Sequence, residues 1–197
     1  RRKLKNLLFI PLTQYGLDYP LEPAFAFQNI KEPLAKIISD AGKKQFHIAE
    51  KEKYAHVTYF FNGGAEKEFP GEDRVIIPSK NIQSYDLIPE MSAYEITKEL
   101  TEKIKGGKYD FLVANLANGD IIGHTGNLKA GIKAVETLDD CIGKILKETL
   151  MAEGSLLITA DHGNVEEMIS LSTGEIDKEH SINPVPFWII SPTNKKT

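Results

Sequence analysis

Apolar and polar residues alternate along the chain in blocks that predict strands separated by helices. Short apolar runs typical of buried strands span residues 7–12, 45–49, 74–77, 109–116, 155–160 and 185–190. Apolar residues at helical spacing predict helices over residues 30–41, 50–61, 92–104 and 128–150. Because strands alternate with helices, we expect an α/β fold in three layers (α/β/α), in which helices cover both faces of a mainly parallel sheet.

The two expected helices of the second half carry the clearest pattern. The segment 92–104 opens with Ser92 and Glu95 at the spacing of a capping box. The segment 128–150 is long and amphipathic. The residues expected to face the core from it are Ile132, Val135, Leu138, Ile142, Ile145 and Leu146. Cys141 lies in the same segment and is expected to be a small core residue.

The composition narrows the class of protein. Hydrophobic residues make up 41% and charged residues 26% of the 197 residues, which is typical of a globular domain. The net charge of -4 favours neither nucleic-acid nor membrane-surface binding, and no apolar run is long enough to span a bilayer. A single cysteine excludes a disulfide framework and a thiolate zinc cluster, so we expect a protein of the reducing cytoplasm.

Acidic and imidazole side chains gather at the ends of three expected strands. They are, in chain order, Asp120, His124, Asp161, His162 and His180. Ligands of open α/β sheets lie beyond the carboxyl ends of the strands, and oxygen and nitrogen donors without thiolate suit Mn²⁺ or Zn²⁺. One helical turn, or a tight loop, would place Asp120 and His124 on the same side. The adjacent Asp161 and His162 either converge in a loop or serve different metals of a pair.

The alternative is that these side chains are structural. An isolated histidine at a strand end is usually a hydrogen-bonded structural residue, and this interpretation is preferred for His47 and His56, which lie inside an expected strand and helix. Three donor segments at strand ends favour a metal site instead. The chain has no G-x-S-x-G, P-loop or H-E-x-x-H motif, which disfavours an α/β-hydrolase, a P-loop NTPase and a zincin.

Five segments resemble the cofactor-independent (2,3-bisphosphoglycerate-independent) phosphoglycerate mutases of the alkaline phosphatase superfamily. They read EKYAHVTYFFNGG, YDLIPEMSAYEIT, NGDIIGHTG, ITADHGNVEEM and EHSINPVPF, and the resemblance extends from about Leu7 to Ile190. It implies an alkaline-phosphatase-like domain. It also implies interconversion of 3-phosphoglycerate and 2-phosphoglycerate through a phosphoserine intermediate, in glycolysis and gluconeogenesis.

The resemblance further implies a site with two divalent metal ions, typically Mn²⁺. The implied ligands are Asp120, His124 and His180 for one ion, and Asp161 and His162 for the other. Lys53 resembles the family lysine that contacts the phosphoryl group near the serine. The stretch 177–181 reads DKEHS where the family usually has H-T-A-H-T, but the ligand histidine remains.

In the family, the nucleophilic serine and one further aspartate ligand come from an N-terminal segment, and the arginine-rich substrate pocket comes from an inserted transferase domain. By this resemblance, residues 1–6 are expected to be the return from that inserted domain, and residues 7–197 the C-terminal segment of the phosphatase-like domain. The expected partners are a phosphoglycerate substrate and these other segments of the same protein. The chain alone is expected to be inactive.

Two other functions stay open. One is a metal-dependent phosphatase or phosphohydrolase on the same scaffold, and the other is a non-catalytic metal-binding or interaction domain. The segments 53–58 and 183–186 favour the mutase over the phosphatase.

Overall fold

The computed structural model describes residues 7–13, 21–25 and 30–192, and the expected domain remnant at residues 1–6 lies outside them. The strands are β1 (Gln45–Glu50), β2 (Glu72–Ile77), β3 (Phe111–Asn115), β4 (Leu156–Thr159) and β5 (Phe187–Ile190). The helices are α1 (Leu34–Asp40), α2 (Tyr54–Val57), α3 (Ala93–Gly106), α4 (Asn118–Gly123) and α5 (Leu128–Met151). Short 3-10 turns are η1 (Lys51–Lys53), η2 (Tyr85–Leu87) and η3 (Val165–Glu167).

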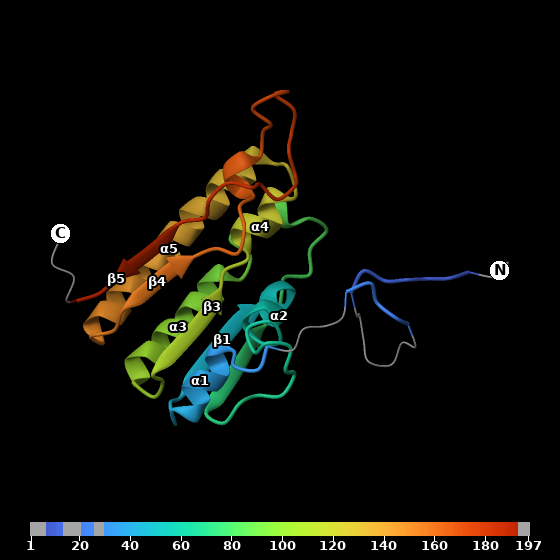
Figure 1. Cartoon of the computed structure of the whole chain (residues 1–197). Coiled ribbons are helices and arrows are strands. Elements are labelled where there is room, and N and C mark those ends of the chain that lie inside the picture. The colour runs from blue at the N-terminus through green and yellow to red at the C-terminus, as the bar shows by residue number, and fades with distance from the viewer. Residues whose placement is uncertain (1–6, 14–20, 26–29, 193–197) are drawn as a thin grey trace.

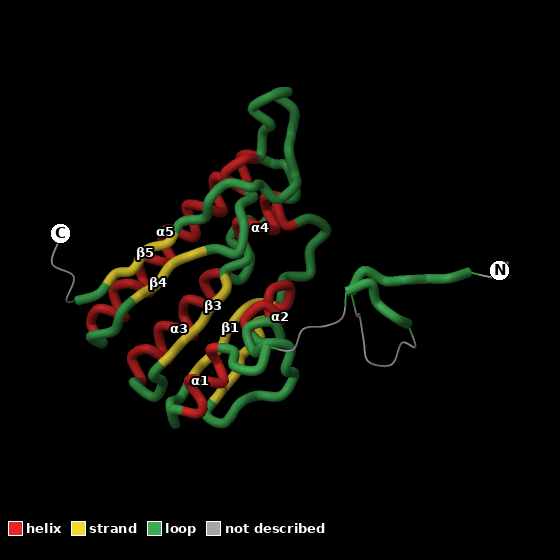
Figure 2. The backbone as a smooth tube through the Cα atoms, in the orientation of Figure 1, coloured by secondary structure: helices red, strands yellow, loops and turns green. Residues whose placement is uncertain are grey.

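The strands form two sheets. Three parallel strands lie in the order β2-β1-β3, with Ile48 of β1 opposite Val75 and Ala114. Strands β4 and β5 form a separate antiparallel pair. Helix α1 lies in front of the strands, and α3 and α5 lie behind them, packed against each other (Figures 1 and 2). The expected α/β fold with a parallel sheet is therefore confirmed, and β5 is the antiparallel exception.

The core lies between the central strand and the two helices behind it. All six residues of β1 are buried, as expected for a central strand covered on both faces. The main cluster comprises Phe46, Ile48, Ile96, Leu100 and Ile145. A second cluster, at the carboxyl end of β3, joins α4 to α5 and comprises Met91, Ala117, Ile122, Ala130 and Ala134. Its small alanine side chains let α4 pack closely against α5, and this packing fixes the position of α4.

Helix α5 buries only part of the face predicted: Ile145 lies in the core as expected, and Leu138, Ile142 and Leu146 are half-buried. Its buried residues are small or polar for the most part and include Ala130, Gly131, Ala134, Thr137 and Cys141. Ile132 is 55% exposed and Val135 is 46% exposed, so the prediction that they face the core was wrong. Close packing against α3 and α4 selects the stripe of small residues, which hydrophobicity alone does not reveal. Cys141 is fully buried, as predicted.

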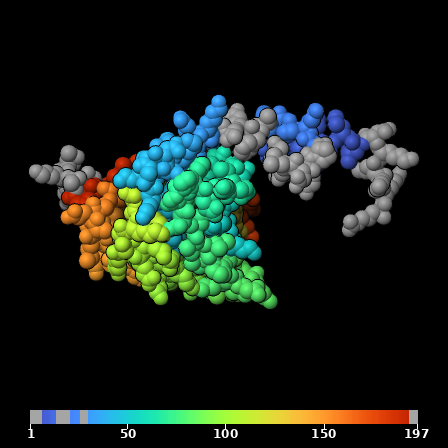
Figure 3. Space-filling view, turned by 90° about the horizontal axis from the view of Figure 1, so that it is seen from below, coloured from blue at the N-terminus to red at the C-terminus, as the bar shows by residue number. Residues whose placement is uncertain are grey.

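Three further predictions were wrong in part. Residues 7–12 form no strand, and Leu8 is 80% exposed, because this segment has no partner strand among the described residues (Figure 3). The expected helix over 50–61 is only η1 followed by the four residues of α2. Strands β4 and β5 exist but are largely exposed, because no described element covers their outer face.

The expected capping box of α3 is not formed either. The hydroxyl of Ser92 donates to the carbonyl of Pro78 at 3.3 Å, and Glu95 forms an ion pair with Lys80 instead of capping. Within the part of the chain that the structure describes, no helix combines the length and the apolar character that a membrane crossing requires.

Candidate metal centre

Asp120 lies in the first turn of α4, the short helix that follows β3, and His124 lies at the end of that helix. The buried side chain of Asn118 donates to the carbonyl of Pro89 at 2.7 Å and fixes the start of α4. The amide of His124 donates to the carbonyl of Asp120 at 3.1 Å, which closes one helical turn. This turn places both side chains on the same side, so the spacing argument from the sequence is confirmed.

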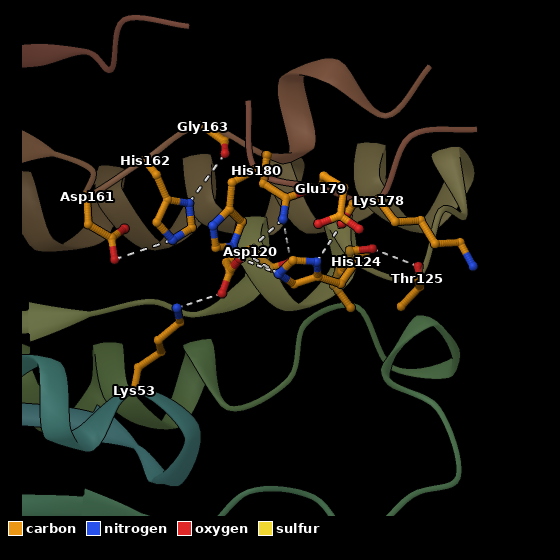
Figure 4. Close-up of polar contacts among 12 residues, drawn as sticks. Lys53, Asp120, His124, Thr125, Asp161, His162, Gly163, Lys178, Glu179 and His180 are labelled. Carbon is orange, nitrogen blue, oxygen red and sulfur yellow. Dashed lines mark hydrogen bonds and ion pairs between the residues drawn. The ribbon is translucent and has the colours of Figure 1, made fainter. Parts of the chain in front are cut away.

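His180 reaches the same point from a segment 60 positions away along the chain. Its Nε2 lies 3.1 Å from Oδ1 of Asp120 and 3.1 Å from Nε2 of His124, and His124 Nε2 lies 3.0 Å from the same Oδ1 (Figure 4). Among the described residues, these are the one group of three acidic or imidazole side chains close enough to hold one metal ion. Two of the three are exposed, so the centre opens to solvent.

The hydrogen bond made by one ring nitrogen of His124 leaves the other one facing the cluster. Nδ1 of His124 lies 2.6 Å from the carbonyl oxygen of Lys178, which can only accept, so Nδ1 carries the proton (Figure 4). The other ring nitrogen, Nε2, is then available as a ligand, and it faces the carboxylate oxygen of Asp120. A cation between the three donor atoms would contact all of them.

The spacing of the three donor atoms fits a divalent metal. Nitrogen and oxygen ligands of such ions lie about 2.0–2.2 Å from the metal, which places neighbouring ligand atoms about 3 Å apart. The observed separations are 3.0, 3.1 and 3.1 Å. The donor set of one carboxylate and two imidazoles suits Mn²⁺, Co²⁺ or Zn²⁺. The geometry therefore fits a first-row divalent ion.

Lys53 faces the other oxygen of Asp120. It lies in η1, directly after β1, and its Nζ is 2.6 Å from Oδ2 of Asp120 (Figure 4). Burial alone would raise the pKa of Asp120, but the hydrogen bond and charge of Lys53, with a smaller effect from Asn164, lower it to about 2. Asp120 is therefore ionised at every physiological pH, as a metal ligand must be.

The second predicted pair lies beside this cluster but does not join it. Oδ2 of Asp161 is 3.5 Å from Nε2 of His162, and the His162 ring stacks on the His180 ring with centroids 3.7 Å apart. The pair thus borders the centre through ring stacking. Two donors alone form an incomplete metal site.

The sequence analysis missed two residues around the centre. Asn164 is buried, and its side chain donates to Oδ1 of Asp120 at 3.2 Å. Glu166 accepts hydrogen bonds from Asn164 and from Ser181, next to His180. No spacing pattern in the sequence predicts these residues, because they contact residues far away along the chain.

His47 is structural, as predicted. It is fully buried, and its ring nitrogens lie 2.5 Å from the carbonyl of Val57 and 3.0 Å from Oε1 of Gln45.

The parallel sheet and the donor cluster beyond its carboxyl edge define an α/β metal-binding domain. A family model described as the Metalloenzyme superfamily matches residues 20–197, and the chain belongs to this family.

Curated relatives give a more particular likeness. A 2,3-bisphosphoglycerate-independent phosphoglycerate mutase of Clostridium beijerinckii is 49% identical over 200 residues, which cover 100% of this chain and 39% of the relative. The protein of the same name from Vibrio cholerae is 48% identical to this chain. The match covers 95% of this chain and 37% of the relative. The chain therefore spans less than two fifths of these relatives.

A solved structure has the same fold over the matched part. The phosphoglycerate mutase of Leishmania mexicana, crystallised at low cobalt concentration, superimposes with a TM-score of 0.85 at 28% sequence identity. The match covers 95% of this chain and 37% of that protein. The expected family resemblance is confirmed by these comparisons, and the family carries a dependence on divalent metal.

Proposed function

We propose that this chain is the metal-binding portion of a cofactor-independent phosphoglycerate mutase, which interconverts 3-phosphoglycerate and 2-phosphoglycerate. The observation that carries the proposal is the convergence of Asp120, His124 and His180 on one point beside Lys53. The likeness to full-length mutases over nearly the whole chain supports it. A cytoplasmic location and a role in glycolysis and gluconeogenesis go with this proposal and stay predictions.

The residues divide into two groups. In the proposal, Asp120, His124 and His180 hold one Mn²⁺, and Asp161 and His162 supply part of the site for a second. Two such ions lower the pKa of an attacking hydroxyl and neutralise phosphoryl oxygens. Lys53 adds a fixed positive charge at the same edge, where the transferred phosphoryl group gains negative charge. The Lys178 carbonyl keeps the His124 Nε2 free for the metal.

The proposal assigns the rest of the reaction to other parts of the protein. The mutase relatives are more than twice as long as this chain. In the proposal, residues 7–197 belong to a phosphatase-like domain, and the serine nucleophile, a further aspartate ligand and the substrate pocket lie in other segments. Positioning of substrate accounts for much of the rate of such enzymes, so the chain alone is expected to turn over no phosphoglycerate.

A coupled enolase assay with millimolar Mn²⁺ tests the assignment. The chain produced together with the remaining segments of the full-length gene should convert 3-phosphoglycerate, and the chain alone should not. Release of inorganic phosphate without 2-phosphoglycerate would favour the phosphatase instead. Mn²⁺ binding with neither activity in the full-length protein would favour the non-catalytic domain.

A further inference from the structure

The segment that carries His180 and the segment that follows His162 meet at Glu166. Oε2 of Glu166 accepts a hydrogen bond from the amide of Asn164 at 2.7 Å. Its Oε1 accepts one from the hydroxyl of Ser181 and another from the Asn183 side chain, the latter at 3.2 Å. One carboxylate therefore receives three donors from two separate segments.

The contact on the Ser181 side acts on His180. Ser181 follows His180 directly, and its amide donates to the carbonyl of Gly163 at 3.0 Å in an isolated antiparallel bridge. Because Glu166 holds the Ser181 hydroxyl, this residue is fixed through both its backbone and its side chain. A residue fixed in this way restricts the backbone from which the adjacent imidazole projects.

The contact on the Asn164 side acts on Asp120. Glu166 holds the backbone amide of Asn164, and the buried side chain of Asn164 donates to the Asp120 carbonyl at 3.3 Å and to its Oδ1 at 3.2 Å. Glu166 thus supports two of the three donor atoms, each through one intermediate residue. Its hydrogen bonds go to Asn164, Ser181 and Asn183 rather than to the donor atoms, so its role is positional.

A glycine at position 163 allows Glu166 and Ser181 to approach each other closely. A Cβ on Gly163 would overlap with Oε1 of Glu166 and with Oγ of Ser181, so only glycine permits the three groups to meet. Burial raises the pKa of Glu166, but the hydrogen bonds from Ser181, Asn164 and Asn183 together lower it, and the group stays an ionised acceptor. A glutamine side chain offers one acceptor oxygen and cannot replace it.

We propose that Glu166 is a positioning residue that fixes His180 and Asp120 at the spacing a divalent metal requires. This inference deepens the proposed function, because it rests on the metal centre assigned there. Residues that orient ligands typically change metal affinity about 10–100-fold when they are lost.

Two measurements on the full chain, with and without Mn²⁺, test this role. Glu166→Gln should weaken Mn²⁺ binding at least tenfold by titration calorimetry. In the metal-free protein it should also speed amide hydrogen exchange at Ser181 and Asn164. Glu167→Gln is the matched control, because Glu167 carries the same charge but contacts only Asn183, at 2.8 Å, among these residues. Glu167→Gln should change the affinity less than twofold.

The outcomes separate the two proposals. Faster exchange at both amides in Glu166→Gln, but not in Glu167→Gln, supports the positioning role even if the wild-type chain binds no Mn²⁺, in which case the metal centre itself is wrong. Exchange unchanged in Glu166→Gln overturns the positioning role, whatever the wild-type affinity. An affinity loss that is equal in both variants overturns it as well, because it would reflect charge rather than position.

Discussion

The ammonium group of Lys53 lies 2.6 Å from Oδ2 of Asp120, while Oδ1 of the same carboxylate faces the two histidines. The two side chains are only 8% and 14% exposed. One carboxylate therefore links the 3-10 turn after β1 to helix α4 after β3, and its two oxygens have different partners. Oδ2 balances a fixed positive charge, and Oδ1 is left for a cation.

Replacing Lys53 should destabilise the protein even without metal. Lys53→Met leaves the shielded carboxylate of Asp120 without its closest partner, and loss of one member of a largely buried pair costs about 2–4 kcal/mol. Urea unfolding of the metal-free chain measures this cost. Lys51→Met, in the same turn but exposed, is the control and should change stability by less than about 0.5 kcal/mol. Equal effects of both variants would show that the pair contributes nothing.

His180 and His162 should differ sharply in their effect on metal binding. His180 Nε2 belongs to the three-donor cluster, whereas His162 only stacks on the ring of His180. By ligand count, Mn²⁺ calorimetry should show about one strong site in the wild-type chain. His180→Ala should remove it, and His162→Ala should retain it with a reduced affinity. Unchanged binding in His180→Ala would rule out the assignment.

Local rules in the sequence predict where several of the candidate donor residues lie. Asp120 and His124 are one helical turn apart, and the strand-end positions of Asp161 and His162 follow from apolar runs that are visible without a structure. These rules involve only residues close together in the sequence, so they can be applied without knowing the fold.

What the sequence misses depends on contacts across the fold. The buried face of α5 is set by how closely α3 and α4 approach it, so Ala134 is buried while Ile132 is exposed. Residues 7–12 look like a strand, but a strand also needs a neighbour with free backbone groups. Asn164 and Glu166 matter only because segments far apart in sequence meet at them.

Stability should fall as the pH drops below about 7, through His47. Burial lowers the pKa of fully buried His47 from its usual 6.5, so the unfolded chain binds the proton first as the pH falls. The stability that neutral His47 supports is present above pH 6.5 and is lost below it. Glu72 adds a second loss below pH 4.5: burial raises its pKa, but hydrogen bonds from Phe69, Arg74 and Asn62 lower it overall.

Urea unfolding of the metal-free chain at pH 7.5, 6.5 and 5.5 measures this dependence. His47→Gln should be less stable at pH 7.5 because it loses a buried ring, and its stability should fall less between pH 7.5 and 5.5. The free energy of unfolding of this variant should still depend on pH to some extent, because burial also lowers the pKa of His56. A slope as steep as that of the wild type would mean that His47 does not carry the pH dependence.

Two helical glycines should respond in opposite ways to the same substitution. A Cβ on Gly123, at the end of α4, would overlap with Oδ1 of Asn164, whereas a Cβ on Gly143 in α5 meets nothing within 4 Å. Gly143→Ala should therefore stabilise the chain by about 0.5–1 kcal/mol, the usual gain from replacing glycine in an exposed helix. Gly123→Ala forgoes this gain, because Asn164 is itself buried and bonded to Asp120 and cannot move freely. It should lower both the free energy of unfolding and the affinity for Mn²⁺, while Gly143→Ala leaves the affinity unchanged. If Gly123→Ala were as stable as Gly143→Ala and bound Mn²⁺ normally, Asn164 would have no part in holding Asp120.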